Sequence, residues 1–465
     1  MKLKSLYRKL RMNLIFNTST FIGNAVLALI LTWLFSGLEY GESVNFVFFL
    51  TVLAIGLWVT ESIPPFSVGI FLIAMLSLGF GTDFIIEESF PVDTYISTWT
   101  SNVIWLLLGG FFLAKGMSVV GLDKSLFRFT IKRFGEEPQK LLLGLMYTTA
   151  LGSMVMSNTA TTAMMVSSVL PLILLIGKEA AFSRALLIGI PAAASVGGIG
   201  TIIGSTPNAI AVGALQEVGV QITFAAWMSF GFPMAILMVW LFWLFLTRRF
   251  ALKGTQIDLS TIKESSFDAK PSHRIAVIIT LFVTIGLWLT EPLHGIPVAG
   301  TSALPIVLLT LTKVVTAEHV RSLPWDTLML VAGGLALGIA LVQVGLAEII
   351  MQEVKSMDIP TFVIAVMFAY IAVLVSNVMS NTAASSILIP LAITLPAVWG
   401  ISVPVIVALS CSCALLLPVS TPSNAISYAT GLIEQKEFRP GGIFLILIAP
   451  IVSIISVLIW VYFFV

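Results

Sequence analysis

The stretch SMVMSNTA at residues 153–160 recurs with one change as SNVMSNTA at residues 376–383. Each copy places a Ser-Asn-Thr triplet in the middle of a long apolar run, where unpaired polar groups are costly. Polar side chains in such a place are stabilised when they bind an ion or a substrate. The duplicated triplets are therefore the first candidates for a functional site, and the segments around them decide the fold.

The composition indicates a protein that crosses a membrane many times. Of the 465 residues, 58% are hydrophobic and only 10% are charged, and apolar runs near the ~20 residues needed to span a bilayer recur along the chain. The basic start, Lys2–Arg11, precedes an apolar run that is too long for a signal peptide, so we expect this run to stay as a spanning helix. Cys411 and Cys413 show neither a disulfide nor a zinc pattern.

We predict an all-α polytopic membrane protein with eleven transmembrane helices plus two re-entrant hairpins. The hairpins, 141–177 and 361–395, carry the repeated motif and are long for one span but short for two. The spans are expected at residues 14–36, 45–60, 65–80, 101–117, 184–214, 222–247, 274–290, 297–312, 326–344, 402–430 and 442–464.

The distribution of charge supports this number of spans. With the N-terminus in the cytoplasm, all of the 24 Lys and Arg residues except Lys355 fall on the cytoplasmic side, as the positive-inside rule requires. The predicted outer loops carry acidic residues such as Asp83 and Glu217. We therefore expect a multi-pass protein of the inner (plasma) membrane, with its C-terminus outside.

Further matches extend the repeat beyond the triplets. Trp58-Val59-Thr60-Glu61 parallels Trp288-Leu289-Thr290-Glu291, and Gly109-Gly110 parallels Gly333-Gly334. Because the first copy contains five crossings, the second enters the membrane from the other side, and such an inverted-topology repeat is a plan of secondary transporters. The predicted domains are an N-terminal helix (1–40), a first repeat (41–247), a cytoplasmic linker (248–273) and a second repeat (274–465).

A second pair of similar motifs interrupts two other apolar spans. These motifs are Gly204-Ser205-Thr206-Pro207-Asn208 and Val419-Ser420-Thr421-Pro422-Ser423-Asn424. Proline removes a backbone donor and kinks a helix, so we expect both spans to be broken and to free carbonyls for a hard cation such as Na⁺. Each half thus brings a hairpin tip and a broken helix to one place. This arrangement predicts two similar cation sites flanking one substrate site.

The hairpins contain no basic side chain that could pair with an anion. No Lys or Arg lies between Lys140 and Lys178, or between Lys355 and Lys436. A helix N-terminus contributes only about half an elementary positive charge, so bound cations are expected to supply the counter-charge of a dianion. We expect Lys115, at the cytoplasmic end of its helix, to extend to the membrane interface.

Other classes of function fit the sequence less well. A channel would need a continuous polar pathway, whereas the polar residues here gather at the two tips. An enzyme would need a nucleophile with a base, or a metal cluster, and neither hairpin contains His, Asp or Glu. No phosphate-binding loop indicates ATP-driven transport. We expect neither enzyme activity nor a nucleic-acid partner.

With its paired Ser-Asn-Thr motifs and paired Thr-Pro loops, the whole chain resembles the divalent anion:sodium symporter family, the bacterial relatives of the mammalian sodium-coupled di- and tricarboxylate carriers. The resemblance implies a homodimer whose protomers each have a scaffold and an elevator-type transport domain. It implies Na⁺-coupled transport of C4-dicarboxylates such as succinate, malate or fumarate. Na⁺-independent exchangers of the same fold, and carriers of sulfate or citrate, are the alternatives.

The resemblance also assigns residues by position. It implies at least two Na⁺ sites, the first formed by Ser153, Ser157, Asn158 and the backbone near Gly200 and Gly204, and the second by Ser376, Asn381 and the backbone near Met379 and Ser420. The substrate carboxylates are implied to contact Asn158, Thr159, Asn381, Thr382, Thr421 and Pro422. Ser423 stands where the family's later loop is expected to have a second proline.

Overall fold

The computed structural model describes residues 18–82, 86, 90–252, 270–393, 395, 402–418 and 420–464. Within these ranges the chain is helical and contains no β-strand, which confirms the all-α prediction for that part of the protein. The basic start Lys2–Arg11, the predicted outer-loop residue Asp83, residues 253–269 of the predicted linker, and Val419 lie outside the described residues.

One compact unit combines Met1–Trp99 with Met329–Asp358. Within it, the Tyr95 hydroxyl donates to Gln343 Oε1 at 3.1 Å and so ties the two segments together. Its described helices are α2 (Thr18–Ser36), α3 (Glu42–Thr60), α4 (Pro65–Gly81), α5 (Asp93–Ile96), most of α17 (Trp325–Gln343) and α18 (Leu346–Ser356).

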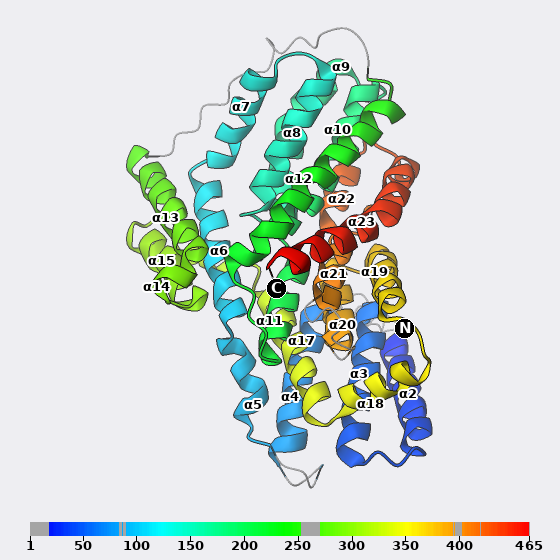
Figure 1. Cartoon of the computed structure of the whole chain (residues 1–465). Coiled ribbons are helices and arrows are strands. Elements are labelled where there is room, and N and C mark those ends of the chain that lie inside the picture. Colours follow the sequence, from blue (N-terminus) through cyan, green and yellow to red (C-terminus); the bar gives the residue numbers. More distant parts are fainter. Residues whose placement is uncertain are drawn as a thin grey trace, which may run out of the picture. The chain divides into compact units, whose positions relative to one another are not determined.

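The second compact unit combines Thr100–Leu328 with Ile359–Val465 and contains both repeated triplets. In Figure 1, α8 and α9 form an antiparallel pair beside α10. The described helices of this unit are α6 (Asn102–Val119), α7 (Leu122–Phe134), α8 (Pro138–Ser153), α9 (Asn158–Ile176), α10 (Ala181–Gly197), α11 (Thr206–Glu217), α12 (Phe224–Arg249), α13 (Pro271–Leu289), α14 (Glu291–His294), α15 (Val298–Leu311), α16 (Ala317–Arg321), α19 (Thr361–Val378), α20 (Asn381–Ile393), α21 (Ser402–Cys411), α22 (Pro422–Ala429) and α23 (Gln435–Phe464).

The predicted hairpins and broken helices correspond to pairs of observed helices. The hairpin expected at 141–177 contains α8 and α9, and the one expected at 361–395 contains α19 and α20. The span expected at 184–214 is divided into α10 and α11, and the span expected at 402–430 into α21 and α22. In all four cases the chain changes direction or loses helical structure at the polar motif.

Nine helices in the described residues are long and apolar enough to cross a membrane, against eleven expected crossings. The expected spans at 65–80 and 297–312 are the shorter apolar helices α4 and α15, of 17 and 14 residues. Conversely, α9 is long enough to span although we expected it to be one limb of a hairpin. The protein is therefore a multi-helix membrane protein, and the number of crossings stays a prediction.

The repeated Trp motif makes one hydrogen bond of the same kind in both copies. Thr60 Oγ1 donates to Gly56 O, and Thr290 Oγ1 donates to Gly286 O, both at 2.7 Å. The tryptophan between them is fully buried in each copy. The first indole donates to Pro65 O at the start of the next helix, and the second donates to Ser302 Oγ, each at 3.1 Å. The motif thus fixes the end of α3 against α4, and the end of α13 against α15.

A glycine from the repeated Gly-Gly pair lies at a close helix contact in each unit. A Cβ built on Gly109 would lie 2.8 Å from Ser302 O, where α6 meets α15. A Cβ on Gly333 would lie 2.1 Å from the Cα of Gly69, where α17 meets α4. The two pairs therefore allow backbones to approach more closely than any side chain would permit.

We expect Gly333→Ala to lower the thermal midpoint of the purified protein by at least about 4 °C, because the added methyl group forces α17 away from α4. The measurement is thermal unfolding in detergent, and Gly23→Ala is the control in the same unit. A Cβ on Gly23 has no heavy atom within 4 Å. Equal midpoints for the two variants would contradict the close contact.

Candidate functional site

The two Ser-Asn-Thr triplets form helix starts of the same geometry. Ser157 precedes α9 and its Oγ accepts a hydrogen bond from Ala160 N at 3.2 Å. Ser380 precedes α20 and its Oγ accepts from Ala383 N, also at 3.2 Å. A serine in this capping position satisfies one of the free amides at a helix start. The asparagine that follows is the first residue of the helix in each copy, at the tip of its hairpin.

Buried asparagine side chains organise the breaks in the other two helices. Asn208 Nδ2 donates to Gly198 O at 3.0 Å and to Thr201 O at 2.8 Å, and Asn424 Nδ2 donates to Leu417 O at 3.0 Å. Pro207 and Pro422 lie in the first turn of α11 and α22. We expected these prolines to kink a helix, but they begin one, which is where proline's missing N–H costs nothing.

The side chain of Asn158 faces three oxygen atoms, Ser153 Oγ, Ala194 O and Gly204 O. One end of its amide lies 2.6, 3.0 and 3.1 Å from these atoms, and Ser153 is fully buried. With Nδ2 turned towards them, the amide donates hydrogen bonds. With Oδ1 turned towards them, four oxygens lie together, and oxygen atoms are the ligands that hard cations prefer. Rotation of one amide therefore converts a hydrogen-bonded group into an oxygen cluster.

The second tip has a similar arrangement. Ser376 Oγ lies 2.7 Å from Asn381 Oδ1 and 2.6 Å from the carbonyl oxygen of Cys411, and Ser376 is fully buried. A hydroxyl has a single hydrogen, so it can donate to only one of these two acceptors at a time. The group of three oxygens thus has an unused acceptor, which a cation would satisfy. The carbonyls of Ala194 and Cys411, which end or nearly end α10 and α21, were not foreseen.

The other predicted backbone ligands lie within the repeated motifs or contact them. A Cβ on Gly200 would lie 2.6 Å from the Cε of Met154, so this glycine packs against the Met154 side chain. Met379 ends α19 with extended backbone, at φ −125° and ψ 174°. Ser420 Oγ donates to the carbonyl oxygen of Asn377 at 2.8 Å. As cation ligands, Gly200, Met379 and Ser420 stay predictions.

At the one position that differs between the two motifs, the side chain makes different contacts in each copy. Asn377 Nδ2 donates to Val373 O, and its Oδ1 accepts from Leu416 N, both at 2.7 Å. Its counterpart Met154 has no such groups and packs against Gly200 instead. The loop after α21 is thus held by side-chain hydrogen bonds that the first motif cannot make.

A buried hydroxyl pair joins the two broken helices. Ser205 Oγ, at the start of α11, lies 2.8 Å from Ser412 Oγ, just after α21. Both side chains are buried. The two interrupted helices therefore contact each other at their breaks. This contact is expected if both breaks contribute to one site.

Both tips and both broken helices line one cavity of about 590 Å³. All six predicted substrate residues lie in its wall, together with Ser157 and Gly204 from the predicted first cation site, whereas Ser153 and Ser376 lie behind the tips. Thr206 and Pro207 also line it, although we assigned a substrate role only to their counterparts in the second half. The repeat itself was the signal that could have found them.

Two charged residues also line this cavity, Lys115 from α6 and Asp326 from the first turn of α17. Our expectation placed Lys115 at the membrane interface, and the charge argument considered only the hairpins. The neighbouring helix α6 brings a basic side chain into the wall of the same cavity. The statement that an anion would meet no basic group is therefore corrected for this cavity.

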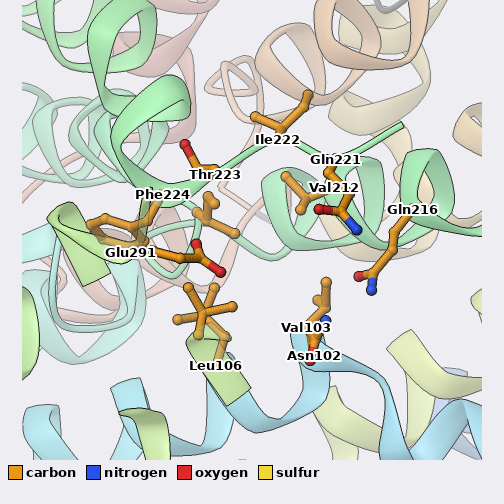
Figure 2. A pocket seen from close by; sticks show the side chains of 12 residues that line it. Asn102, Val103, Leu106, Val212, Gln216, Gln221, Ile222, Thr223, Phe224 and Glu291 are labelled. Atoms are coloured by element: carbon orange, nitrogen blue, oxygen red, sulfur yellow. The ribbon is translucent and has the colours of Figure 1, made fainter. Parts of the chain in front are cut away.

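A second, much smaller cavity of about 50 Å³ lies among α6, the α11–α12 connection and the start of α14. Figure 2 shows Glu291 of the repeated Trp motif at this cavity, with the amide side chains of Asn102, Gln216 and Gln221. The space suffices for one or two water molecules but not for a dicarboxylate. The larger cavity is thus the candidate site for an organic anion.

Comparison with known proteins finds transporters among the relatives of this chain. The sequence profile of the citrate transporter family matches residues 55–411. The chain is 30% identical over 441 residues to the sodium-dependent dicarboxylate transporter SdcS of Staphylococcus aureus strain USA300, covering 86% of this chain and 82% of SdcS. SdcS of S. aureus strain bovine RF122 / ET3-1 matches to the same extent.

A similar solved structure is that of the YdaH transporter from Alcanivorax borkumensis. The TM-score is 0.52 with 15% sequence identity, and the match covers 86% of this chain and 97% of the other. At this identity the likeness shows a shared fold only. The profile match and the identity to SdcS, in contrast, extend over most of the chain. They show a membrane transporter rather than an enzyme, and the chain belongs to the citrate transporter family, which confirms the resemblance to divalent anion:sodium symporters.

Proposed function

We propose that this protein is a secondary active symporter that couples Na⁺ to the transport of C4-dicarboxylates such as succinate, malate or fumarate. The observation that carries the proposal is the single cavity lined by both Ser-Asn-Thr tips and both Thr-Pro loops. Hydroxyl and amide groups in this wall can donate hydrogen bonds to carboxylate oxygens. The relative SdcS is named a sodium-dependent dicarboxylate transporter, which supports the same substrate class and the same coupling ion.

The proposed Na⁺ sites are the two oxygen groups behind the tips. The first combines Asn158 with Ser153 and the carbonyls of Ala194 and Gly204. The second combines Asn381 with Ser376 and the carbonyl of Cys411. Because Asn158 and Asn381 face both an oxygen group and the cavity, a bound cation would fix the amide that holds the substrate. Coupling would then follow from shared ligands, with at least two Na⁺ for each substrate.

The mechanism that we propose is elevator-type alternating access, in which a transport domain carrying the tips moves against a scaffold. The two halves would be inverted repeats, a plan in which substrate and ion sites lie at broken helices near the midplane. We also propose a homodimer in the plasma membrane, with the N-terminus in the cytoplasm and the C-terminus outside. The predicted domain boundaries, 1–40, 41–247, 248–273 and 274–465, belong to the same proposal.

The competing function is transport of citrate or sulfate, or Na⁺-independent exchange, by the same fold. The matching family is described as citrate transporters, which favours citrate among these alternatives. The cavity has room for a tricarboxylate as well as a dicarboxylate, so its volume does not separate them. A competition panel of dicarboxylates, citrate and sulfate against labelled succinate would rank these substrates directly.

The test of the proposal is uptake of radiolabelled succinate into proteoliposomes. We expect accumulation with an inward Na⁺ gradient and only background uptake when K⁺ replaces Na⁺, because two oxygen groups must be filled before the tips hold a dianion. If each transport cycle moves more positive charges on Na⁺ than negative charges on the substrate, an inside-negative membrane potential will increase the rate of succinate uptake. Equal uptake in Na⁺ and K⁺ would refute the coupling to Na⁺ and favour the exchanger.

A further inference from the structure

The substrate cavity contains one basic side chain, and that side chain has no described partner. Lys115 is half-buried in the cavity wall near the C-terminal end of α6. Within the described part of the chain, no hydrogen bond or ion pair involves its ammonium group. The helix that carries it has no Asp or Glu at all. The positive charge of Lys115 is therefore available to a ligand in the cavity.

Among the described residues of the same wall, Asp326 is the only one with a carboxylate, and its own helix stabilises that charge. Asp326 lies in the first turn of α17, where the helix dipole favours a negative charge. It is exposed, and among the described residues no ion pair joins it to Lys115. Asp326 can thus remain charged without Lys115, and it does not occupy the position of an incoming anion.

The cavity extends well beyond the two Ser-Asn-Thr tips. Besides the tips, its wall includes Ser118 at the end of α6, residues 322–324 before α17, and Asp326 and Thr327 in the first turn of α17. The distribution of Lys and Arg predicts that these segments lie on the cytoplasmic side of the membrane. A dicarboxylate between the tips and the cytoplasm would therefore pass Lys115.

Resting on the proposed function, we propose that Lys115 is a specificity-determining residue that binds one carboxylate of a dianionic substrate as it enters or leaves the site through this cavity. An ammonium group that is partly removed from water attracts a carboxylate more strongly than an exposed one does. The tips then hold one carboxylate by hydroxyl and amide groups, and Lys115 favours substrates with a second negative charge. The residue discriminates dianions from monoanions of the same length.

The test compares succinate with its half-amide, succinamate, which keeps the length but carries one carboxylate. In Lys115→Met we expect the KM for succinate to rise about tenfold, the size of one lost charge-assisted contact. The KM for succinamate should change less than twofold. Lys115→Arg should keep the preference for succinate, because it keeps the charge.

Lys313→Met is the matched control, since Lys313 is exposed and does not line the cavity. It should behave like the wild type with both substrates. An equal change of KM for succinate and succinamate in Lys115→Met, or no change for either, would overturn the role of Lys115 while leaving the proposed function intact. Wild-type protein that fails to transport succinate with Na⁺ would overturn both.

Discussion

Asn158→Ala and Asn381→Ala are each expected to reduce Na⁺-driven succinate uptake at least about a hundredfold, to the background of empty liposomes. Alanine removes the amide from an oxygen group on one side and from the cavity on the other. Each buried polar group left without a partner costs about 1–3 kcal/mol, and several lose their partner at once. The measurement is the initial rate of uptake at saturating Na⁺ and at several succinate concentrations.

A folding defect could also abolish uptake, so a second measurement separates the two causes. Na⁺ that binds only the folded protein raises its thermal midpoint. We expect this rise to be smaller in either single variant and absent in the double variant. Ser167→Ala is the control on the same helix as Asn158. Ser167 is exposed, its hydroxyl donates to Met164 O of its own helix, and it is not among the described residues that line the cavity. Full uptake by Asn158→Ala would show that its amide is no part of the site.

Gly198→Ala is expected to abolish transport by filling the first oxygen group. The new methyl carbon would lie 2.6 Å from Asn158 Oδ1 and 2.5 Å from Gly204 O, closer than carbon and oxygen atoms can approach. The backbone of Gly198 has φ −56°, which alanine adopts easily, so the conflict is with the oxygen group and not with the local conformation. We expect uptake at background and no Na⁺-dependent rise of the thermal midpoint.

The control for this variant is Gly286→Ala in the same compact unit. A Cβ on Gly286 has no heavy atom within 4 Å, and the residue lies within a helix, where alanine is favoured over glycine. We expect wild-type uptake from Gly286→Ala. A Na⁺-dependent midpoint shift of normal size in Gly198→Ala would mean that the cation binds elsewhere.

The interruptions of the helices at the polar motifs could be predicted because such motifs in apolar segments have few structural solutions, whereas the re-entrant path of the hairpins stays a prediction. Ser157 and Ser380 are good caps, so helices begin after them, and the chain must turn before them. The role of Pro207 and Pro422 was harder to predict. Proline disfavours the middle of a helix but suits its start, and only the upstream carbonyls held by Asn208 and Asn424 decide between these outcomes.

The sequence does not indicate which helices pack against each other. Lys115 lies 42 positions before Ser157, and no local pattern indicates that α6 faces the tips. The carbonyls of Ala194 and Cys411 were missed for another reason: every residue has a carbonyl, so residue type carries no signal for a backbone ligand. The contact between Ser205 and Ser412 joins segments 207 positions apart and depends on packing alone.

The single difference between the two motifs determines whether one half of the chain could replace the other. A chain made by doubling the present first half would place methionine at position 377 and leave the amide of Leu416 without its acceptor. A chain made by doubling the second half would lose the thioether that covers Gly200. The two halves are therefore not interchangeable at this position, because each side chain makes a contact that the other could not make.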